Sequence, residues 1–178
     1  MDMTLRRVAD FTDAERADSA ALSRAVYPPE VAASWSGRHL EWSAAEWGVL
    51  VRDGGGALVS YLGIILRESL HDGLPVRVGG VGGVKTHPAA RRQGLAARAV
   101  GRAVEFLREQ PDVAFGLLVC EPHLLGYYGR LGWHEFSGQL MVRQRGEPCE
   151  FTLYRVMVCP VRGTAPAAGT IDLSGPPW

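Results

Sequence analysis

The 178-residue sequence predicts an α+β (α/β) fold in which helices flank a mixed sheet. Residues 47–52 and 57–68 are apolar stretches joined by Asp53-Gly54-Gly55-Gly56, and this pattern indicates an antiparallel hairpin. Residues 76–86 form a third apolar stretch, and an amphipathic helix follows, with Ala96, Ala99, Val100, Ala103, Val104 and Leu107 on one side. The near-continuous apolar run at residues 113–120 is typical of a strand buried on both faces.

The N-terminal segment predicts one strand and one helix. Residues 4–11 resemble a strand. Thr12-Asp13-Ala14-Glu15 is a capping box, which predicts a helix that runs to about Arg24. Pro28 and Pro29 should end this helix.

Residues 30–47 are rich in tryptophan, and two interpretations are open. Trp35, Trp42 and Trp47 could belong to the core. Alternatively, Trp35 and Trp42 form an apolar wall of an acceptor pocket, with Glu41 and Glu46 to hold a cationic substrate. Helical spacing would place Trp42 near Glu46, so that one helix presents both surfaces.

The C-terminal part predicts a short helix at residues 124–131 and a closing pair of strands at 133–144 and 151–159. Residues 163–178 are rich in Ala, Gly and Pro, and by default they form a loose extension. Trp178, however, is a large apolar group to leave in water. We therefore expect a domain over residues 1–162 and a tail, 163–178, that packs near the acceptor site.

The composition limits the classes of protein to which the chain can belong. With 47% hydrophobic and 21% charged residues, the chain is typical of one globular domain. The longest strongly apolar run, residues 61–66, is too short to cross a bilayer, and the N-terminus lacks an apolar signal region, so we expect a cytoplasmic protein. The 19 basic and 19 acidic residues balance, which favours neither nucleic acid nor an anionic membrane as partner. Three cysteines without C-x-x-C spacing argue against disulfides and a metal site.

The loop after residues 76–86 gathers positive charge at a helix start. It holds Lys85, His87, Arg91 and Arg92. A helix start already carries a partial positive charge and unpaired N–H groups, so cations there are disfavoured unless a ligand supplies negative charge. Gly94, placed inside the helix, would cost about 1 kcal/mol relative to alanine unless a ligand must touch bare backbone. The segment therefore predicts a phosphate site.

Two common phosphate motifs are excluded. A P-loop requires a glycine immediately before Lys85, where this chain has Val84. The dinucleotide fingerprint beginning at Gly80 would require a glycine at Lys85 itself.

The segment Arg91-Arg92-Gln93-Gly94-Leu95-Ala96 instead resembles motif A of the GNAT acetyltransferase superfamily, and Tyr128-Gly129-Arg130-Leu131-Gly132-Trp133 resembles its motif B. The resemblance implies the GNAT fold, a mixed sheet of about six to seven strands with about four helices, splayed where acetyl-CoA binds. It also implies that consecutive backbone N–H groups bind the pyrophosphate. The implied cofactor-binding residues are Val84, Lys85, Thr86, Arg91, Arg92, Gln93, Gly94, Leu95, Ala96 and Tyr128.

The same resemblance assigns chemical roles. Tyr128 is the candidate proton donor to the leaving thiolate, with Tyr127 as a rival, because a phenol can protonate a thiolate. The N–H of Val84 is the implied donor to the developing oxyanion. Direct transfer is expected, and a route through Cys120 is the less favoured alternative.

Within the superfamily, the chain resembles most the aminoglycoside 2'-N-acetyltransferases, including a terminus of the form Gly-x-x-Trp. Those enzymes usually carry a glutamate, as base through water, where this chain has Gly82. Glu121 is the first candidate replacement. The others are Glu41, Glu46, Glu150, Asp172 and the Trp178 carboxylate. The implied acceptor-binding residues are Trp35, Glu41, Trp42, Gly82, Gly83, Glu121, Glu150, Asp172 and Trp178.

The resemblance implies acetylation of the 2'-amino group of an aminoglycoside-like antibiotic, with kasugamycin as one acceptor, and hence a role in antibiotic resistance. The alternatives are acetylation of another small amine or peptide N-terminus, or an acyl-CoA-binding module without catalysis. A homodimer is expected because related acetyltransferases often pair.

Overall fold

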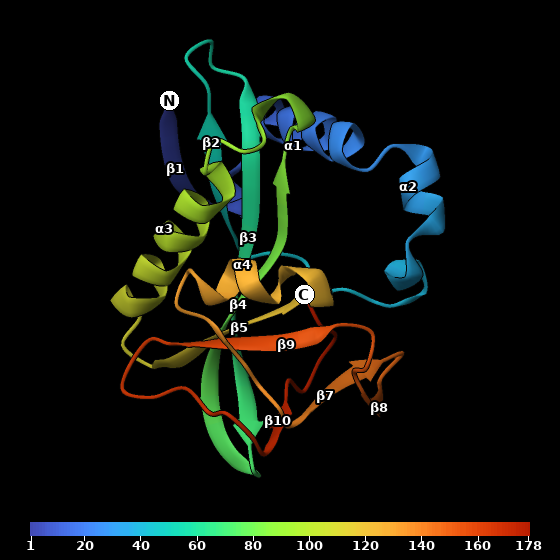
Figure 1. Cartoon of the computed structure of the whole chain (residues 1–178), viewed down its shortest axis with the longest axis vertical. Coiled ribbons are helices and arrows are strands. Elements are labelled where there is room, and N and C mark those ends of the chain that lie inside the picture. Colours follow the sequence, from blue (N-terminus) through green and yellow to red (C-terminus); the bar gives the residue numbers. More distant parts are fainter.

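The computed structural model describes residues 1–178 and contains one curled, mixed sheet of ten strands with four α-helices (Figure 1). The predicted fold class is confirmed, with more strands than expected. The strands are β1 (Asp2–Arg7), β2 (Trp47–Arg52), β3 (Leu58–His71), β4 (Leu74–Thr86), β5 (Val113–Cys120), β6 (His134–Glu135), β7 (Gln139–Gln144), β8 (Glu147–Glu150), β9 (Arg155–Pro160) and β10 (Thr170–Asp172). The helices are α1 (Asp13–Val26), α2 (Pro29–Ser34), α3 (Leu95–Glu109) and α4 (Leu125–Gly129).

The long strand β3 organises the sheet. One of its edges pairs with β4, and its other edge is shared by β2 near the start and β10 at the end. The strand order β6-β9-β5-β4-β3-β10-β7-β8 runs through it, with β2 and β1 added beside β3. Most neighbours are antiparallel, and the pairs β4/β5 and β10/β7 are parallel.

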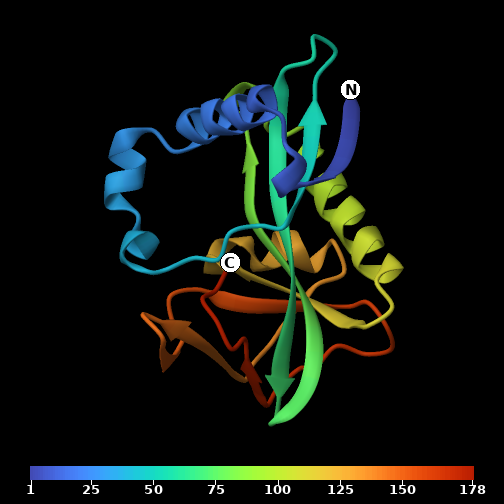
Figure 2. The same ribbon diagram turned by 180° about the vertical axis from the view of Figure 1, so that it is seen from behind.

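The two long helices cover opposite faces of the sheet, as the views from front and back show (Figures 1 and 2). The alternation along β2 explains this arrangement, because Val49 and Val51 belong to the core cluster that includes α3, whereas Leu50 belongs to the cluster that includes Leu22 of α1. The face of α3 selected from the sequence is buried, with Ala99, Val100, Ala103, Val104 and Leu107 at most 9% exposed.

The N-terminal region differs from its prediction in two places. The first strand ends at Arg7, and residues 8–10 form a 3₁₀ turn instead of continuing the strand. Pro29 starts a second helix, α2, because proline is well tolerated in a helix's first turn, where its missing N–H has no intrahelical partner.

The helix expected to carry Glu41, Trp42 and Glu46 does not exist. After a 3₁₀ turn at Ser36–His39, residues 40–46 run without regular structure into β2. Tertiary contacts hold this segment, for example the bond from the Ser43 N–H to the Pro177 carbonyl at 2.7 Å.

The prediction of a closing pair of strands at residues 133–144 and 151–159 was also wrong. Residues 133–144 divide into β6, which pairs with β9, and β7, which pairs with β8 and β10. The tail is not a loose extension, since β10 inserts between β3 and β7, and Ile171 and Leu173 are fully buried. The C-terminus consequently lies in the middle of the molecule (Figure 1).

None of the helices combines the length and apolar character that a membrane span requires. All three cysteines are free thiols.

Candidate active site

The sheet opens between β4 and β5. Their parallel pairing ends at Gly80 opposite Leu117, whereas both strands continue, β4 to Thr86 and β5 to Cys120. A bulge in β4 lies at the same place, because the register with β3 shifts between Tyr61 and Gly63, and Gly83 has a φ of 59°. Gly83 and Val84 therefore have no register partner on either neighbouring strand. Glycines within a strand often mark such a bulge.

A cavity of about 310 Å³ lies beside this opening, between the end of β4, the start of α3 and α4. Eight of the ten residues proposed for the cofactor are brought together there. The lining is Val84, Thr86, Ala90, Arg91, Arg92, Gly94, Leu95, Ala96, Leu124, Tyr127 and Tyr128.

The start of α3 is built to receive an anion. Gly94 is the N-cap and not an interior residue, as had been assumed; its φ of 72° is left-handed, which explains a glycine here without any interior helix cost. No side chain caps the helix, and the N–H groups of Leu95 and Ala96 make no hydrogen bond within the chain. Unpaired N–H groups, the helix dipole and two lining arginines together fit a pyrophosphate such as that of acetyl-CoA.

Two of the residues proposed to bind the cofactor, Lys85 and Gln93, do not line the first cavity. The Lys85 ammonium donates to Ser23 Oγ at 2.7 Å and lies 4.9 Å from the centroid of the Tyr61 ring, so its side chain packs under α1. Burial lowers the pKa of Lys85. Gln93 is exposed and does not line the cavity. The basic cluster read from the sequence is thus smaller than it seemed, because alternate residues of a strand face opposite sides.

Tyr128 is the buried tyrosine of α4, 6% exposed, and it lines the cavity. Its hydroxyl makes no hydrogen bond within the chain, so it is available to a ligand. Burial raises the pKa of Tyr128 well above its ordinary value, with smaller contributions from Cys120, Tyr127 and Tyr27. The phenol therefore holds its proton at neutral pH. The rival Tyr127 is half-buried and lines the same cavity, and burial raises its pKa too.

A second cavity, of about 210 Å³, reaches the other end of the bulge. Its lining contains Gly83, and the first cavity's lining contains the next residue, Val84, so both cavities reach the bulge. The lining is Ser43, Ala45, Tyr61, Gly63, Ile64, Ile65, Gly80, Gly82, Gly83 and Trp178. It includes no charged side chain.

Trp178 forms one wall of the second cavity, and two glycines of β4 make room for it. A Cβ atom at Gly80 would lie 2.2 Å from Trp178 Cε2, and one at Gly82 would lie 2.8 Å from the Trp178 main-chain carbon. The indole N–H of Trp178 donates to the Leu117 carbonyl at 3.1 Å. Trp178 is thereby held beside the last residue pair of β4 and β5.

The five side-chain carboxylates proposed as bases do not line either cavity, whereas the main chain of Trp178, whose carboxylate was the sixth candidate, lies at the second cavity. Glu41 accepts from the Arg145 N–H at 2.7 Å, Glu46 from the Leu66 N–H at 3.2 Å, and Asp172 from the Ser174 N–H at 2.7 Å. Glu121 is exposed and lies 3.2 Å from His123 Nδ1. Glu150 is exposed on the outer strand β8. Four of the five thus have a partner within the chain.

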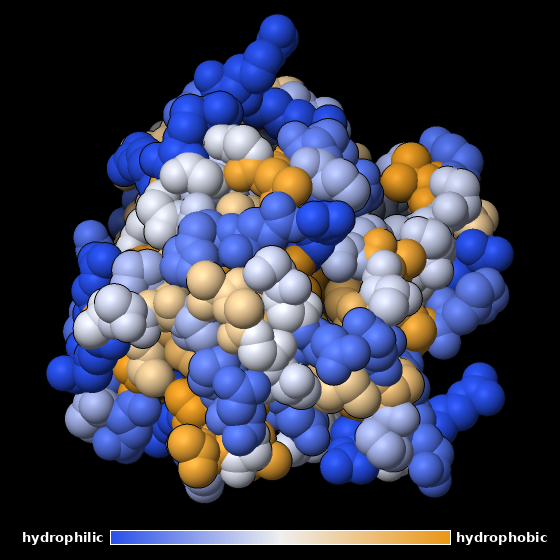
Figure 3. Space-filling model, turned by 60° about the horizontal axis from the view of Figure 1, so that its bottom comes forward, coloured by the Kyte–Doolittle hydropathy of each residue, from blue (hydrophilic) through white to orange (hydrophobic).

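The tryptophan-rich segment forms an aromatic cluster outside both cavities. Trp35 stacks on Trp42 at 5.4 Å between ring centroids, and its indole N–H donates to the Tyr154 hydroxyl. Trp47 belongs to the core, where it packs on Phe106. Residues 29–39, which include α2 and the 3₁₀ turn after it, form an arch, here called the arch of α2. Two apolar side chains remain partly exposed on it, Val31 at 44% and Trp35 at 39%. Figure 3 shows this arch as a lobe at the right that carries apolar residues.

Three residues of this site had escaped sequence reasoning. Ser43 and Tyr61 line the second cavity, and Arg67 holds the tail against it. No local motif marks them, because the tail that completes the cavity lies more than a hundred residues further along the chain.

Comparison with known proteins agrees with this geometry. The family model described as acetyltransferase (GNAT) domain matches residues 7–136, which is most of the chain. The chain belongs to the GNAT acetyltransferase family. It is therefore an acetyltransferase that uses acetyl-CoA.

Solved structures show the same fold at low identity. The GNAT family N-acetyltransferase YhbS from Escherichia coli, in complex with CoA, is 16% identical with a TM-score of 0.63, covering 96% of this chain and 89% of that one. An acyl-CoA N-acyltransferase from Pseudomonas aeruginosa is 22% identical with a TM-score of 0.62, covering 89% and 98%. A GNAT family acetyltransferase from Brucella melitensis, in complex with acetyl-CoA, is 14% identical with a TM-score of 0.58, covering 96% and 94%. No curated protein matches the sequence.

Proposed function

We propose that this GNAT acetyltransferase transfers the acetyl group directly to a primary amine of a small amino sugar of the aminoglycoside type, at a 2'-amino position, with kasugamycin as a fitting acceptor. The observation that carries the proposal is that the two cavities are lined by adjacent residues of the bulge, the first by Val84 and the second by Gly83. A donor held in the first cavity and an amine held in the second would come together there.

Residues of the first cavity would hold the donor. The N–H groups of Leu95 and Ala96, together with Arg91 and Arg92, bind the pyrophosphate. Acetyl-CoA supplies the acetyl group as a thioester. The N–H of Val84, a residue without a register partner in the sheet, would donate a hydrogen bond to the thioester carbonyl oxygen. Tyr128 holds a proton for the leaving sulfur, which its buried, protonated phenol suits.

Residues of the second cavity would hold the acceptor. The Trp178 main chain occupies the space that a side chain at position 82 would need. In this proposal, the Trp178 main-chain oxygen is the hydrogen-bond acceptor that a polar side chain at position 82 would otherwise provide. This oxygen accepts a hydrogen bond from the amine and orients it towards the bulge. The apolar walls, Ile64, Ile65 and the Trp178 ring, contact the body of the acceptor.

The size and charge of the second cavity favour a small acceptor with few ammonium groups. A cavity of about 210 Å³ without a charged side chain in its lining offers little to a polycation. A compact amino sugar fits it better than a large, multiply charged aminoglycoside does. The same property supports a second candidate, another small amine or a peptide N-terminus with an apolar first residue, for which the apolar arch of α2 offers further contact.

A thiol-release assay tests this proposal. The purified enzyme is incubated with acetyl-CoA and a panel containing kasugamycin, larger aminoglycosides, small aliphatic amines and short peptides. We expect turnover with kasugamycin above that with the larger aminoglycosides. Turnover with amines or peptides alone would establish the second candidate, and acetyl-CoA binding without turnover on any acceptor would support a non-catalytic module.

A further inference from the structure

A single side chain joins the tail to the loop that faces it. The Pro176 carbonyl accepts hydrogen bonds from Arg67 Nη1 at 2.6 Å and from Ser43 Oγ at 2.8 Å. Arg67 Nη2 also donates to Ser43 Oγ at 2.6 Å. Arg67, on β3, therefore bonds to both partners at once, as the planar fork of a guanidinium allows.

The same guanidinium supports the Trp178 ring. Its central carbon lies 5.1 Å from the centroid of that ring, within the range of a cation–π contact. The tail approaches so closely that a Cβ atom at Gly175 would lie 3.0 Å from Arg67 Nη1. Pro176 and Pro177 have no N–H groups, so the tail's hydrogen bonds here run through its carbonyls.

An ion pair does not account for the partly buried position of the Arg67 side chain. It makes none with any carboxylate, and its recorded bonds go to a carbonyl and a hydroxyl. Burial lowers the pKa of Arg67, and the nearby Glu46 opposes this shift. Desolvating a guanidinium costs free energy, and here no ion pair offsets that cost, although Glu46 opposes it from a distance. The hydrogen bonds of Arg67 instead fix the position of the Pro176 carbonyl relative to the Ser43 hydroxyl.

We propose that Arg67 is a positioning residue for acetyl transfer: it fixes Ser43 and the segment 176–178 against each other and so sets the shape of the acceptor cavity. Ser43 and Trp178 line that cavity, whereas Arg67 does not. The assignment of this cavity to the acceptor rests on the proposed function. Because Arg67 does not line the cavity at the start of α3, its removal should alter acceptor use and leave acetyl-CoA binding intact.

Steady-state kinetics test the catalytic part of this proposal. For Arg67→Met, we expect the acceptor KM to rise about tenfold or more, with the acetyl-CoA KM within about twofold of the wild type. Arg67→Lys should recover part of the loss, because an ammonium keeps the charge and one of the two hydrogen bonds. The matched control is Arg77→Met on the neighbouring strand β4, a half-buried arginine paired with Glu68 and Asp112 and absent from the cavity lining. Its acceptor KM should not change.

Amide hydrogen exchange tests the positioning itself, whichever acceptor the enzyme uses. The Ser43 N–H donates to the Pro177 carbonyl, so Arg67→Met should speed exchange at Ser43 while the β3/β4 amides keep their protection. Thermal unfolding verifies that each variant is folded, and Arg67→Lys serves if the methionine variant is not. Unchanged exchange at Ser43, or equal rises in both KM values, would overturn the proposal. If no acceptor is acetylated by the wild type, the proposed function fails, and the exchange experiment still decides the role of Arg67.

Discussion

At the scale of single residues, the bulge of β4 and the second cavity depend on residues that have no side chain. Gly80 and Gly82 leave space for the Trp178 ring and its main chain, and Gly83 provides the left-handed turn of the bulge. Two buried phenols lie at these cavities, Tyr61 at the second and Tyr128 at the first. A small number of atoms therefore shapes the walls of the two cavities at the bulge.

Removal of the Tyr128 hydroxyl should separate chemistry from binding. In Tyr128→Phe we expect kcat to fall roughly 100-fold, because the leaving sulfur loses its proton donor, while the acetyl-CoA KM stays near normal. Tyr127→Phe, in the same helix and cavity, is the control and should keep most of its activity. If instead Tyr127→Phe is the inactive variant, the roles of the two tyrosines are exchanged.

The pH dependence follows from the groups in the cavities. No side-chain carboxylate lines the second cavity, so kcat/KM should rise with pH until the acceptor amine has reached its own pKa. It should not fall again below about pH 10, because burial raises the pKa of Tyr128 above that of a free phenol. A pH profile from pH 6 to pH 10 measures this. An early plateau, well below the amine pKa, would indicate a protein base such as Glu121.

A methyl group at position 80 should disturb the acceptor cavity. For Gly80→Ala we expect a loss of about 1–3 kcal/mol in the free energy of unfolding, since the new Cβ would overlap the Trp178 ring. The acceptor KM should rise as well. Gly101→Ala in α3 is the control, because nothing lies within 4 Å of its Cβ position, and it should stabilise the protein by roughly 0.5–1 kcal/mol. Urea unfolding of the two variants gives both values.

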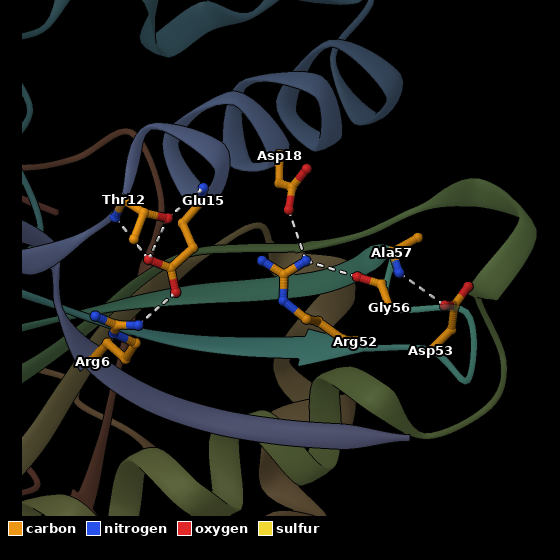
Figure 4. Close-up of polar contacts among 8 residues, drawn as sticks. All are labelled: Arg6, Thr12, Glu15, Asp18, Arg52, Asp53, Gly56 and Ala57. Carbon is orange, nitrogen blue, oxygen red and sulfur yellow. Dashed lines mark hydrogen bonds and ion pairs between the residues drawn. The ribbon is translucent and has the colours of Figure 1, made fainter.

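At the scale of secondary structure, the best-defined element is the start of α1 (Figure 4). The Thr12 hydroxyl accepts from the Glu15 N–H at 3.2 Å, and the Glu15 carboxylate accepts from the Thr12 N–H at 2.8 Å. Arg6 and Asp18 then connect the helix to the sheet, through the pairs Arg6–Glu15 and Arg52–Asp18.

Loss of this cap should destabilise the protein without affecting catalysis. Thr12→Ala should lower the free energy of unfolding by about 1 kcal/mol and leave kcat unchanged. The pKa of Glu15 is lowered, first by the hydrogen bond from the Thr12 N–H. Its contribution is therefore complete above the ordinary glutamate pKa and declines as the pH falls through the lowered value. Urea titrations at pH 7 and pH 3 should show a smaller difference between wild type and Thr12→Ala at the lower pH.

The elements that could be predicted from sequence are those with strong local signals. The capping box at Thr12, the turn at residues 53–56 and the continuous apolar run of β5 each correspond to an observed boundary. Residues 40–46 could not be predicted, because their conformation depends on the distant Gln144 and Pro177. Lys85 was misplaced for another reason, since charge alone does not reveal which face of a strand a side chain occupies.

At the scale of the whole molecule, the tail is part of the sheet. β10 joins β3 to β7 and so connects the hairpin β7/β8 to the rest of the fold. Its composition alone suggested a loose segment, because Ala, Gly and Pro carry little periodic signal. The few apolar residues within it, Ile171, Leu173 and Trp178, are all buried.

Shortening one buried side chain of the tail should show that the tail is part of the folded structure. Ile171 is fully buried, so Ile171→Ala should reduce the free energy of unfolding by about 2–5 kcal/mol. Val161, only partly buried just after β9, offers a control, and Val161→Ala should cost much less. Equal, small effects of both substitutions in chemical denaturation would mean that the tail is dispensable for folding.

The buried position of Trp178 has a practical consequence for recombinant work. A peptide joined directly after this residue would begin beside Gly82, at the wall of the second cavity. A purification handle is better joined before β1, whose outer edge is free of neighbouring strands at the rim of the sheet.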